Sequence, residues 1–175
     1  MLASRRLYEG RILSLREDTV ELANGRRARR EVVEHADVVA IVPVDAAGRV
    51  LLVRQYRLPA GQVLLEVPAG GVDPGESVEE AAQRELQEET GQRAARWRRL
   101  GGFFVSPGYC TEFIHAFLAE ELSEGVVEAD FDEQIAVERV SLGEALRLVQ
   151  SGQIRDAKSI IGLLLTASLM GSTPA

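Results

Sequence analysis

The sequence predicts a layered α/β fold, in which helices cover a sheet of buried strands. Residues 37–45 and 49–56 are nearly continuous apolar runs around an Ala-Ala-Gly turn. Such runs occur in strands that are covered on both faces. Among the predicted helices, one runs from Ser77 to Gly91 and one over residues 154–170. With 175 residues, of which 46% are hydrophobic, the chain is long enough for one domain with a sizeable core and a small extension.

The N-terminal part of the chain predicts a small, charged β region. Residues 7–21 interleave apolar and charged side chains, and Asn24-Gly25 is a hairpin turn signal before a strand over residues 28–34. A β region this short and this charged has little core of its own. We therefore expect residues 1–36 to be a β extension that packs on the main domain, residues 37–175, or on another copy of the chain.

The rest of the chain predicts strands and helices in alternation. Strands are predicted at residues 63–67, 97–104, 112–119 and 134–140, with an acidic loop over residues 120–133. Ser141 followed by Glu144 predicts the start of a helix that extends to about residue 150.

Composition excludes several function classes. A net charge of −7 argues against a general nucleic-acid binder, although it does not exclude a nucleotide substrate. Cys110 is the only cysteine, so no internal disulfide can form, which is consistent with a reducing compartment. Residues 1–10 lack the apolar core of a signal peptide, and the apolar run 160–170 is too short to span a bilayer. We therefore expect a cytoplasmic protein that binds neither nucleic acid nor membranes.

The stretch from Gly70 to Gln92 combines a loop rich in Gly and Pro with an acidic helix. Ser77 and Glu80 form a capping-box pattern, and Gly91 is suited to end the helix. On the helix face of small residues that should pack on the core, carboxylates follow at i, i+3 and i+4; they are Glu85, Glu88 and Glu89. Like charges about 5–6 Å apart repel unless a cation holds them. Oxygen ligands without sulfur or imidazole indicate Mg²⁺ or Mn²⁺.

The alternative is that the whole helix is simply a solvated acidic helix. This interpretation fits the opposite face, where Glu80, Gln83, Arg84 and Gln87 are expected to be ordinary solvated surface. It fits the three glutamates less well, because they lie on the face of small residues and follow a loop with repeated Gly and Pro.

The same stretch resembles the Nudix box. That family pattern is Gly, five residues, Glu, seven residues, then Arg-Glu-aliphatic-any-Glu-Glu-any-Gly-aliphatic, and its matches here are Gly70, Glu76, Arg84, Glu85, Leu86, Glu88, Glu89 and Gly91. Gln92 replaces the usual final aliphatic residue, at a packing position. Further segments, among them LLVRQYRL, LLEVPAG and FFVSPGYCTE, are similar to the ADP-ribose pyrophosphatase branch of the family. Members of that branch have a proline sixteen residues after the final glycine, and Pro107 has this position.

The resemblance implies a fold, an assembly and a metal site. The fold would be the Nudix α/β/α sandwich with a mixed sheet. The assembly would be a homodimer whose N-terminal strands cross to the partner and help to build the substrate pocket. The metal ligands would be the Ala69 carbonyl, Glu85 and Glu89, with Glu88 helping to hold a second ion. Glu76 and Arg84 would orient these ligands.

The resemblance also implies substrate contacts. Arg57 would contact phosphate or ribose, Arg29 and Glu31 would reach the adenosine end across the dimer, and Glu112, after the Pro107 loop, would lie near the metals. The general base would be Glu133, with Asp130 and Asp132 as rivals in the same acidic loop. A carboxylate away from the metals is needed because metal-bound glutamates have their lone pairs committed. Each of these arginines and glutamates could instead form a surface ion pair.

The expected activity is therefore Mg²⁺-dependent hydrolysis of ADP-ribose, a small-molecule nucleoside diphosphate, into AMP and ribose 5-phosphate. Two alternatives stay open. The substrate could be another nucleoside diphosphate sugar, such as GDP-mannose, or a dinucleotide. The chain could also be a ligand sensor without hydrolysis, although such sensors usually lose box carboxylates or gain a DNA-binding domain, and this chain does neither.

Overall fold

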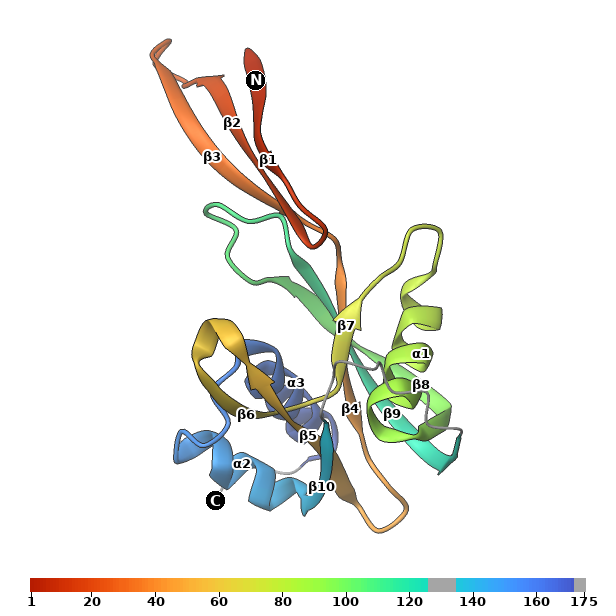
Figure 1. Cartoon of the computed structure of the whole chain (residues 1–175). Coiled ribbons are helices and arrows are strands. Elements are labelled where there is room, and N and C mark those ends of the chain that lie inside the picture. Colours follow the sequence, from red (N-terminus) through yellow and green to blue (C-terminus); the bar gives the residue numbers. More distant parts are fainter. Residues whose placement is uncertain (126–134, 172–175) are drawn as a thin grey trace.

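The computed structural model describes residues 1–125 and 135–171, and Figure 1 shows a small sheet that projects from a main body of two further sheets and three α-helices. The main body has helices on both faces of its larger sheet. Within the described ranges, no helix is long and apolar enough to cross a membrane.

The projecting sheet is antiparallel and consists of β1 Ala3–Glu9, β2 Leu13–Glu21 and β3 Arg27–His35. The predicted hairpin turn is confirmed, because Gly25 adopts a left-handed φ of 74° and Asn24 Oδ1 accepts a hydrogen bond of 3.1 Å from the Arg26 N–H. Every residue of β1 is exposed. The sheet therefore has little core of its own, as the sequence predicts.

The larger sheet has the order β7-β4-β9-β8 and comprises β4 Val38–Pro43, β7 Ala69–Gly71, β8 Gln92–Phe104 and β9 Phe113–Glu124. β4 and β9 are parallel and the other pairs are antiparallel, so the sheet is mixed. All six residues of β4 are buried, which confirms that both faces of this strand are covered. The three-residue strand β7 is not predicted from the sequence.

The prediction of an acidic loop over residues 120–133 is wrong at its start, because β9 continues to Glu124. Arg96 and Arg98 of β8 contact the carboxylate of Glu120 at 3.0 and 3.3 Å. Opposite charges on neighbouring strands stabilise a sheet, so the beginning of the acidic run is paired as a strand. Residues 126–133 of the predicted loop lie outside the described residues.

The second sheet of the main body has the order β10-β5-β6 and comprises β5 Arg49–Arg57, β6 Gln62–Glu66 and β10 Ala136–Ser141, with the 3₁₀ helix η1 Leu58–Ala60 between β5 and β6. The apolar centre of β5 is buried, as predicted. β6 is an edge strand, and only Val67 and Pro68 separate its end from β7. This short connection joins the two sheets of the main body.

The helices α1 Val78–Thr90 and α3 Ala157–Leu169 pack on opposite faces of β4, and α2 Leu142–Gln150 packs on α3 and β5. Alternation along β4 explains the two faces. Val39 and Ile41 join the buried cluster of α1, whereas Val38, Ala40 and Val42 join the cluster of α2 and α3. The predicted α/β fold with a mixed sheet between helices is therefore confirmed.

The last helix begins later than the predicted residue 154. Asp156 is its N-cap residue, and its Oδ1 accepts a hydrogen bond of 3.1 Å from the Ser159 N–H. A capping carboxylate satisfies a backbone N–H that has no partner inside the helix, so the chain becomes helical only after it. Ile154 is buried before the helix begins, which accounts for its apolar character.

Candidate functional site

Helix α1 carries the predicted metal ligands, and its two ends are determined by local sequence. The Ser77 N–H donates to the Glu80 carboxylate at 2.9 Å and the Glu80 N–H donates to Ser77 Oγ at 3.3 Å, so the predicted capping box is confirmed. Gly91 ends the helix with a left-handed φ of 67°. Between these ends, the buried residues Ala81, Ala82 and Leu86 hold the helix on the sheet.

Arg84 joins three of the carboxylates at this site. Its Nη1 donates to Glu85 Oε1 at 2.6 Å and to Glu88 Oε2 at 3.0 Å. Its Nε and Nη2 donate to the two carboxylate oxygens of Glu76 at 3.0 and 2.9 Å, and Nη2 also donates to the Gly71 carbonyl of β7 at 2.8 Å. The interpretation of Arg84 as solvated surface is therefore wrong, because its guanidinium group turns back across the helix to the loop and to β7.

These contacts favour the charged forms of Glu76 and Arg84 and join the loop to the helix. Hydrogen bonds from Arg84 lower the pKa of Glu76 even though burial acts in the opposite direction, and hydrogen bonding to Glu76 raises the pKa of Arg84. Glu76 Oε2 also accepts a hydrogen bond of 3.1 Å from the Asp73 N–H. The ion pair thus fixes the loop that precedes α1 against the side of the helix.

Glu89 is only 8% exposed and reaches across to β7, where its Oε2 accepts a hydrogen bond of 3.1 Å from the Ala69 N–H. The register of β4 and β7 explains why this N–H is available. The Ile41 N–H donates to the Pro68 carbonyl at 2.9 Å, so ladder bonds fall on alternate residues and Ala69 forms a non-hydrogen-bonded pair with Ala40. The N–H and C=O groups of Ala69 therefore point away from β4, which is the direction that a carbonyl ligand beside α1 requires.

Gly70 lies directly beside the carboxylate of Glu85. A Cβ atom at Gly70 would lie 2.0 Å from Glu85 Oε1, which is closer than such atoms can approach. At the neighbouring Gly71 a Cβ atom would meet nothing within 4 Å. The first position of the box therefore requires glycine, because any side chain there would displace Glu85.

The residues at this site fit a hard divalent cation. Arg84 pairs with three carboxylates, those of Glu76, Glu85 and Glu88, so the negative charge exceeds that of its guanidinium group. The carboxylate of Glu89 lies nearby, against the Ala69 N–H. The candidate donors are all oxygen atoms, which Mg²⁺ and Mn²⁺ prefer. In the part of the chain that the structure describes, no three His, Cys, Asp or Glu side chains already converge as a metal-binding group. The donor set thus supports a cation site, while the coordination by individual residues stays a prediction.

A second charged network was not identified from the sequence. Glu66, at the end of β6, is 1% exposed and accepts hydrogen bonds from Arg57 Nη2 at 2.7 Å and Lys158 Nζ at 2.6 Å. Lys158 also donates to Asp156 Oδ1 at 2.9 Å. Burial alone would raise the pKa of Glu66, but hydrogen bonds from Arg57 and the charge of Lys158 outweigh burial and lower it. Arg57, which the sequence predicts to contact substrate, is therefore held by a buried carboxylate.

Two predicted adenosine contacts lie on the projecting sheet. Arg29 and Glu31 are exposed on β3, which extends away from α1 (Figure 1). Arg29 Nη1 lies 3.5 Å from Glu17 of the neighbouring strand β2. Within one chain these residues are not brought to the α1 carboxylates, and their role in binding stays a prediction.

The loop between β8 and β9 carries two further predicted residues. Pro107 is exposed and Glu112 is half-buried. This loop pairs with the end of β3, because the Val33 N–H donates to the Tyr109 carbonyl at 2.7 Å. The loop is therefore connected to the projecting sheet. The predicted base Glu133 and its rivals Asp130 and Asp132 lie outside the described residues.

Comparison with protein families gives two matches along the chain. The NUDIX domain matches residues 34–161, which is most of the chain and includes the whole box. The chain belongs to the Nudix family. Residues 1–33 match the nucleoside diphosphate sugar hydrolase N-terminal domain, so the two matches meet close to the point where β3 ends and β4 begins.

Relatives of this Nudix chain are similar to it over most of their length. It is 41% identical over 160 residues to the ADP-ribose pyrophosphatase of Bacillus subtilis (strain 168), which covers 90% of this chain and 86% of that protein. It is 36% identical over 152 residues to the GDP-mannose pyrophosphatase of Yersinia enterocolitica, which covers 81% and 78%. The crystal structure of an ADP compounds hydrolase matches with a TM-score of 0.87 and 26% identity over 98% of this chain and 95% of that chain. The chain is therefore a Nudix hydrolase, a class of enzymes that generally needs a divalent metal ion.

We expect Gly70→Ala to weaken cation binding by roughly 10–100-fold, the usual scale when a residue that positions a ligand is changed. The added Cβ would displace the carboxylate of Glu85. Titration calorimetry with MnCl₂ would measure the dissociation constant. Gly71→Ala is the matched control, because its Cβ would meet open space. Equal affinities for Gly70→Ala and the unchanged protein would contradict the assignment of Glu85.

The lowered pKa of Glu66 predicts how stability depends on pH. The folded state favours the charged carboxylate, so the network stabilises it above the ordinary glutamate pKa of about 4.3. This stabilisation is lost as the pH falls through the lower pKa of the folded state. In urea unfolding, the difference in free energy between the unchanged protein and Glu66→Gln should therefore be large at pH 7 and shrink below pH 4.

The control for this series is Glu79→Gln, which replaces an exposed glutamate in the first turn of α1. It should shift stability little at any of these pH values. A difference between Glu66→Gln and the unchanged protein that stayed constant from pH 7 to acid would mean that the network does not depend on the charge of Glu66.

Proposed function

We propose that the protein hydrolyses the pyrophosphate bond of ADP-ribose, with a divalent metal ion, and releases AMP and ribose 5-phosphate. One observation carries the proposal: two carboxylates of α1 lie against β7 at Ala69 and Gly70. Glu89 is bonded to Ala69 at 3.1 Å, and Glu85 lies so close to Gly70 that no side chain fits there. Similarity to an ADP-ribose pyrophosphatase over 90% of this chain supports the substrate.

The carboxylates of α1 supply the cation site. A diphosphate linkage resists hydrolysis because its negatively charged oxygens repel a nucleophile. A bound divalent cation supplies charge neutralisation and makes a water molecule more acidic. Glu85 and Glu89 would hold it together with the Ala69 carbonyl, and Glu88 would help to hold a second ion. We propose Mg²⁺ as the ion, with Mn²⁺ as a substitute, because every donor is a hard oxygen.

Two arginines support this chemistry, one by orienting the carboxylates and one by contacting phosphate. Arg84, bonded to Glu76, holds the helix, the loop and β7 in one arrangement, so the ligands are oriented before substrate arrives. Arg57 would contact the phosphate that leaves, where a fixed positive charge stabilises developing negative charge. Its guanidinium group is already oriented by the buried carboxylate of Glu66.

A second candidate is hydrolysis of another nucleoside diphosphate sugar, such as GDP-mannose, or of a dinucleotide. The similarity to a GDP-mannose pyrophosphatase favours it, at lower identity and over less of the chain. The diphosphate chemistry at α1 would be the same, and the difference would lie in contacts to the base and the sugar. A sensor without hydrolysis is disfavoured, because all box carboxylates are present.

We expect ADP-ribose to be cleaved faster than GDP-mannose and diadenosine diphosphate in a substrate panel with Mg²⁺. Chromatography should show AMP and ribose 5-phosphate in equal amounts. Glu89→Gln should lose most of this activity, because it removes a predicted ligand, whereas the control Glu79→Gln should retain it. Faster cleavage of GDP-mannose would favour the second candidate, and Mg²⁺-dependent turnover by Glu89→Gln at the normal rate would contradict the site.

We further propose that the protein is a cytoplasmic homodimer in which each projecting sheet reaches the partner. The support is that this sheet buries little of its own surface and ends in exposed residues such as Arg29 and Glu31. In this arrangement the two residues would contact the adenosine end of the substrate bound by the partner. A net charge of −7 supports a small-molecule substrate rather than nucleic acid.

Light scattering should therefore give a mass of about twice 19.1 kDa. Arg29→Ala should raise KM for ADP-ribose with little change in kcat, because a contact remote from the reacting bond contributes to binding. Arg27→Ala, which changes another exposed arginine of β3, is the matched control. A fully active monomer would contradict the shared pocket.

The last proposal concerns the general base, which we assign to Glu133. Glu133→Gln should lower kcat by roughly 10²–10⁴-fold, the usual effect of losing a general base. KM and Mn²⁺ affinity should change little, because the carboxylate would not hold the metal. Parallel kinetics on Asp132→Asn and Glu112→Gln discriminate its rivals. If kcat falls in one of these variants but not in Glu133→Gln, the residue replaced in that variant is the general base.

A further inference from the structure

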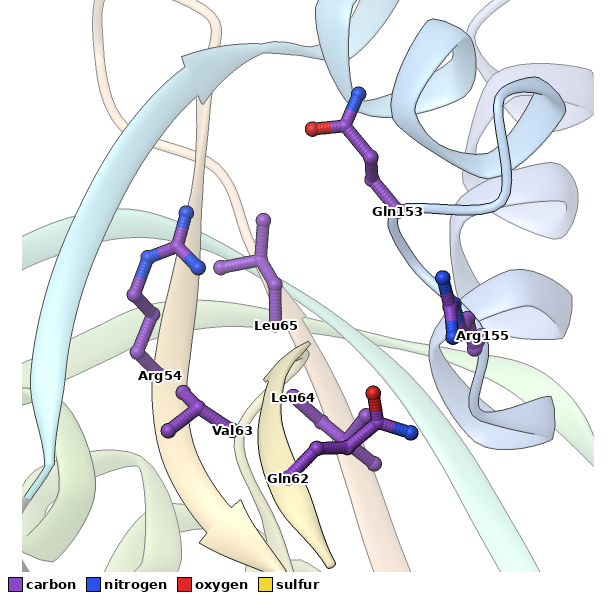
Figure 2. Close-up of a pocket in the computed structure, with 7 residues that line it drawn as sticks. All are labelled: Arg54, Gln62, Val63, Leu64, Leu65, Gln153 and Arg155. Carbon is purple, nitrogen blue, oxygen red and sulfur yellow. The ribbon is translucent and has the colours of Figure 1, made fainter. Parts of the chain in front are cut away.

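A pocket of about 200 Å³ lies between the edge strand β6 and the connection of α2 to α3 (Figure 2). Its polar lining comes from three segments: Arg54 on β5, Gln62 on β6, and Gln153 and Arg155 on the connection. Leucine and valine side chains of β6 form its apolar wall. The volume is several times what one water molecule needs, so a small anion fits with room for an attached group.

The pocket does not belong to the site on α1. None of its lining residues comes from α1 or β7. Gln62 lies across the ladder from Arg57, but the guanidinium group of Arg57 is bonded to Glu66. Figure 2 shows Gln62 extending toward Arg155, on the other side of the strand from Arg54. The two arginines of the pocket are therefore separate from the arginine that we assign to the substrate.

The charges in the pocket favour an anion. Arg54 is paired with Glu138 of β10, whose Oε2 lies 3.3 Å from Arg54 Nη2. Arg155 donates from Nε to the Gly152 carbonyl at 2.6 Å, and in residues 1–125 and 135–171 no carboxylate forms an ion pair with it. The charge of Arg54 is thus neutralised by Glu138. The charge of Arg155 is not balanced by a carboxylate of the described residues.

The neutral lining adds further donors. Gln153 donates from Nε2 to Ser151 Oγ at 3.1 Å, which fixes the direction of its amide group. Gln62 is exposed, and its side chain makes no hydrogen bond within the described part of the chain. Side-chain amides carry two N–H donors each. A ligand with several acceptor oxygens could therefore bond to amides and a guanidinium group at once.

We propose that this pocket binds the phosphate group of inorganic phosphate or of a phosphate monoester. The planar fork of a guanidinium group matches two phosphate oxygens, and charge-assisted hydrogen bonds of this kind are stronger than neutral ones. The room beside the apolar wall suits the carbon atoms of a monoester. Two sources share this chemistry: free phosphate, and the monoester products AMP and ribose 5-phosphate. The second source rests on the proposed function, whereas the first does not.

The test uses the full-length protein with EDTA, so that no cation brings phosphate to the α1 site. Titration calorimetry with sodium phosphate at constant ionic strength should give one saturable site in the unchanged protein and in Arg57→Ala. Arg155→Ala should weaken it by roughly tenfold or more, as expected for a lost charge-assisted hydrogen bond. Arg147→Ala, which removes an exposed arginine of α2, is the matched control and should bind normally.

Three outcomes would overturn the proposal: equal binding by Arg155→Ala, loss of binding in Arg57→Ala alone, or equal heats when sodium chloride replaces phosphate. Circular dichroism and the Tm without ligand check that Arg155→Ala is folded, and Gln62→Ala gives a second, milder variant with the same expected direction. Titrations with AMP and ribose 5-phosphate identify the source of the ligand. A lower dissociation constant for either compound than for inorganic phosphate indicates a monoester. Hydrolysis of ADP-ribose by Arg155→Ala should be normal at low phosphate, so failure here is distinct from failure of the proposed function.

Discussion

The site depends on how one guanidinium group balances the acidic side of helix α1. Arg84 binds the carboxylates of Glu76, Glu85 and Glu88 and the carbonyl of Gly71, so it connects the loop, the helix and β7. Without it, like charges about 5–6 Å apart would repel each other. Its single charge cannot compensate every carboxylate, and the remaining negative charge would favour a divalent cation at the proposed site. The same contacts therefore join the parts of the fold and leave negative charge on this face.

A second constraint acts on residues 66–69, where the chain passes from one sheet of the main body to the other. Glu66 is bonded to Arg57 and Lys158, and the Val67 N–H donates to Ser159 Oγ of α3 at 2.8 Å. The Pro68 carbonyl accepts from the Ile41 N–H of β4, and the Ala69 N–H donates to Glu89 of α1. These successive residues are thus tied to β5 and α3, then to β4, and then to α1. A buried ion pair is expensive to leave half-paired, so the Glu66 network holds Arg57 and the start of β7 in a fixed relation.

Features with a strong local pattern could be predicted from the sequence. The capping box at Ser77, the hairpin at Gly25, the buried strand β4 and the glutamates of α1 follow from spacing alone. Pairing across the chain could not be predicted. Glu66 and Lys158 are 92 residues apart, and the one available signal was a glutamate in the otherwise apolar strand of residues 63–67. The extension of β9 depends on arginines of β8, and β7 is too short for any periodicity to show.

The alternation of peptide groups along β7 limits how this protein can change length during evolution. Ala69 and Gly71 face outward because the ladder bonds to β4 fall on the residues between and beside them. A slip of one residue would turn those groups toward β4 and leave the peptide of Gly70 facing α1, with neither the Glu89 bond nor the Arg84 bond in place. Insertions can therefore be absorbed in the turns at residues 45–48 and 58–61, which lie before the anchored segment. Homologues should differ in length at those turns while the number of residues from 66 to 71 stays constant.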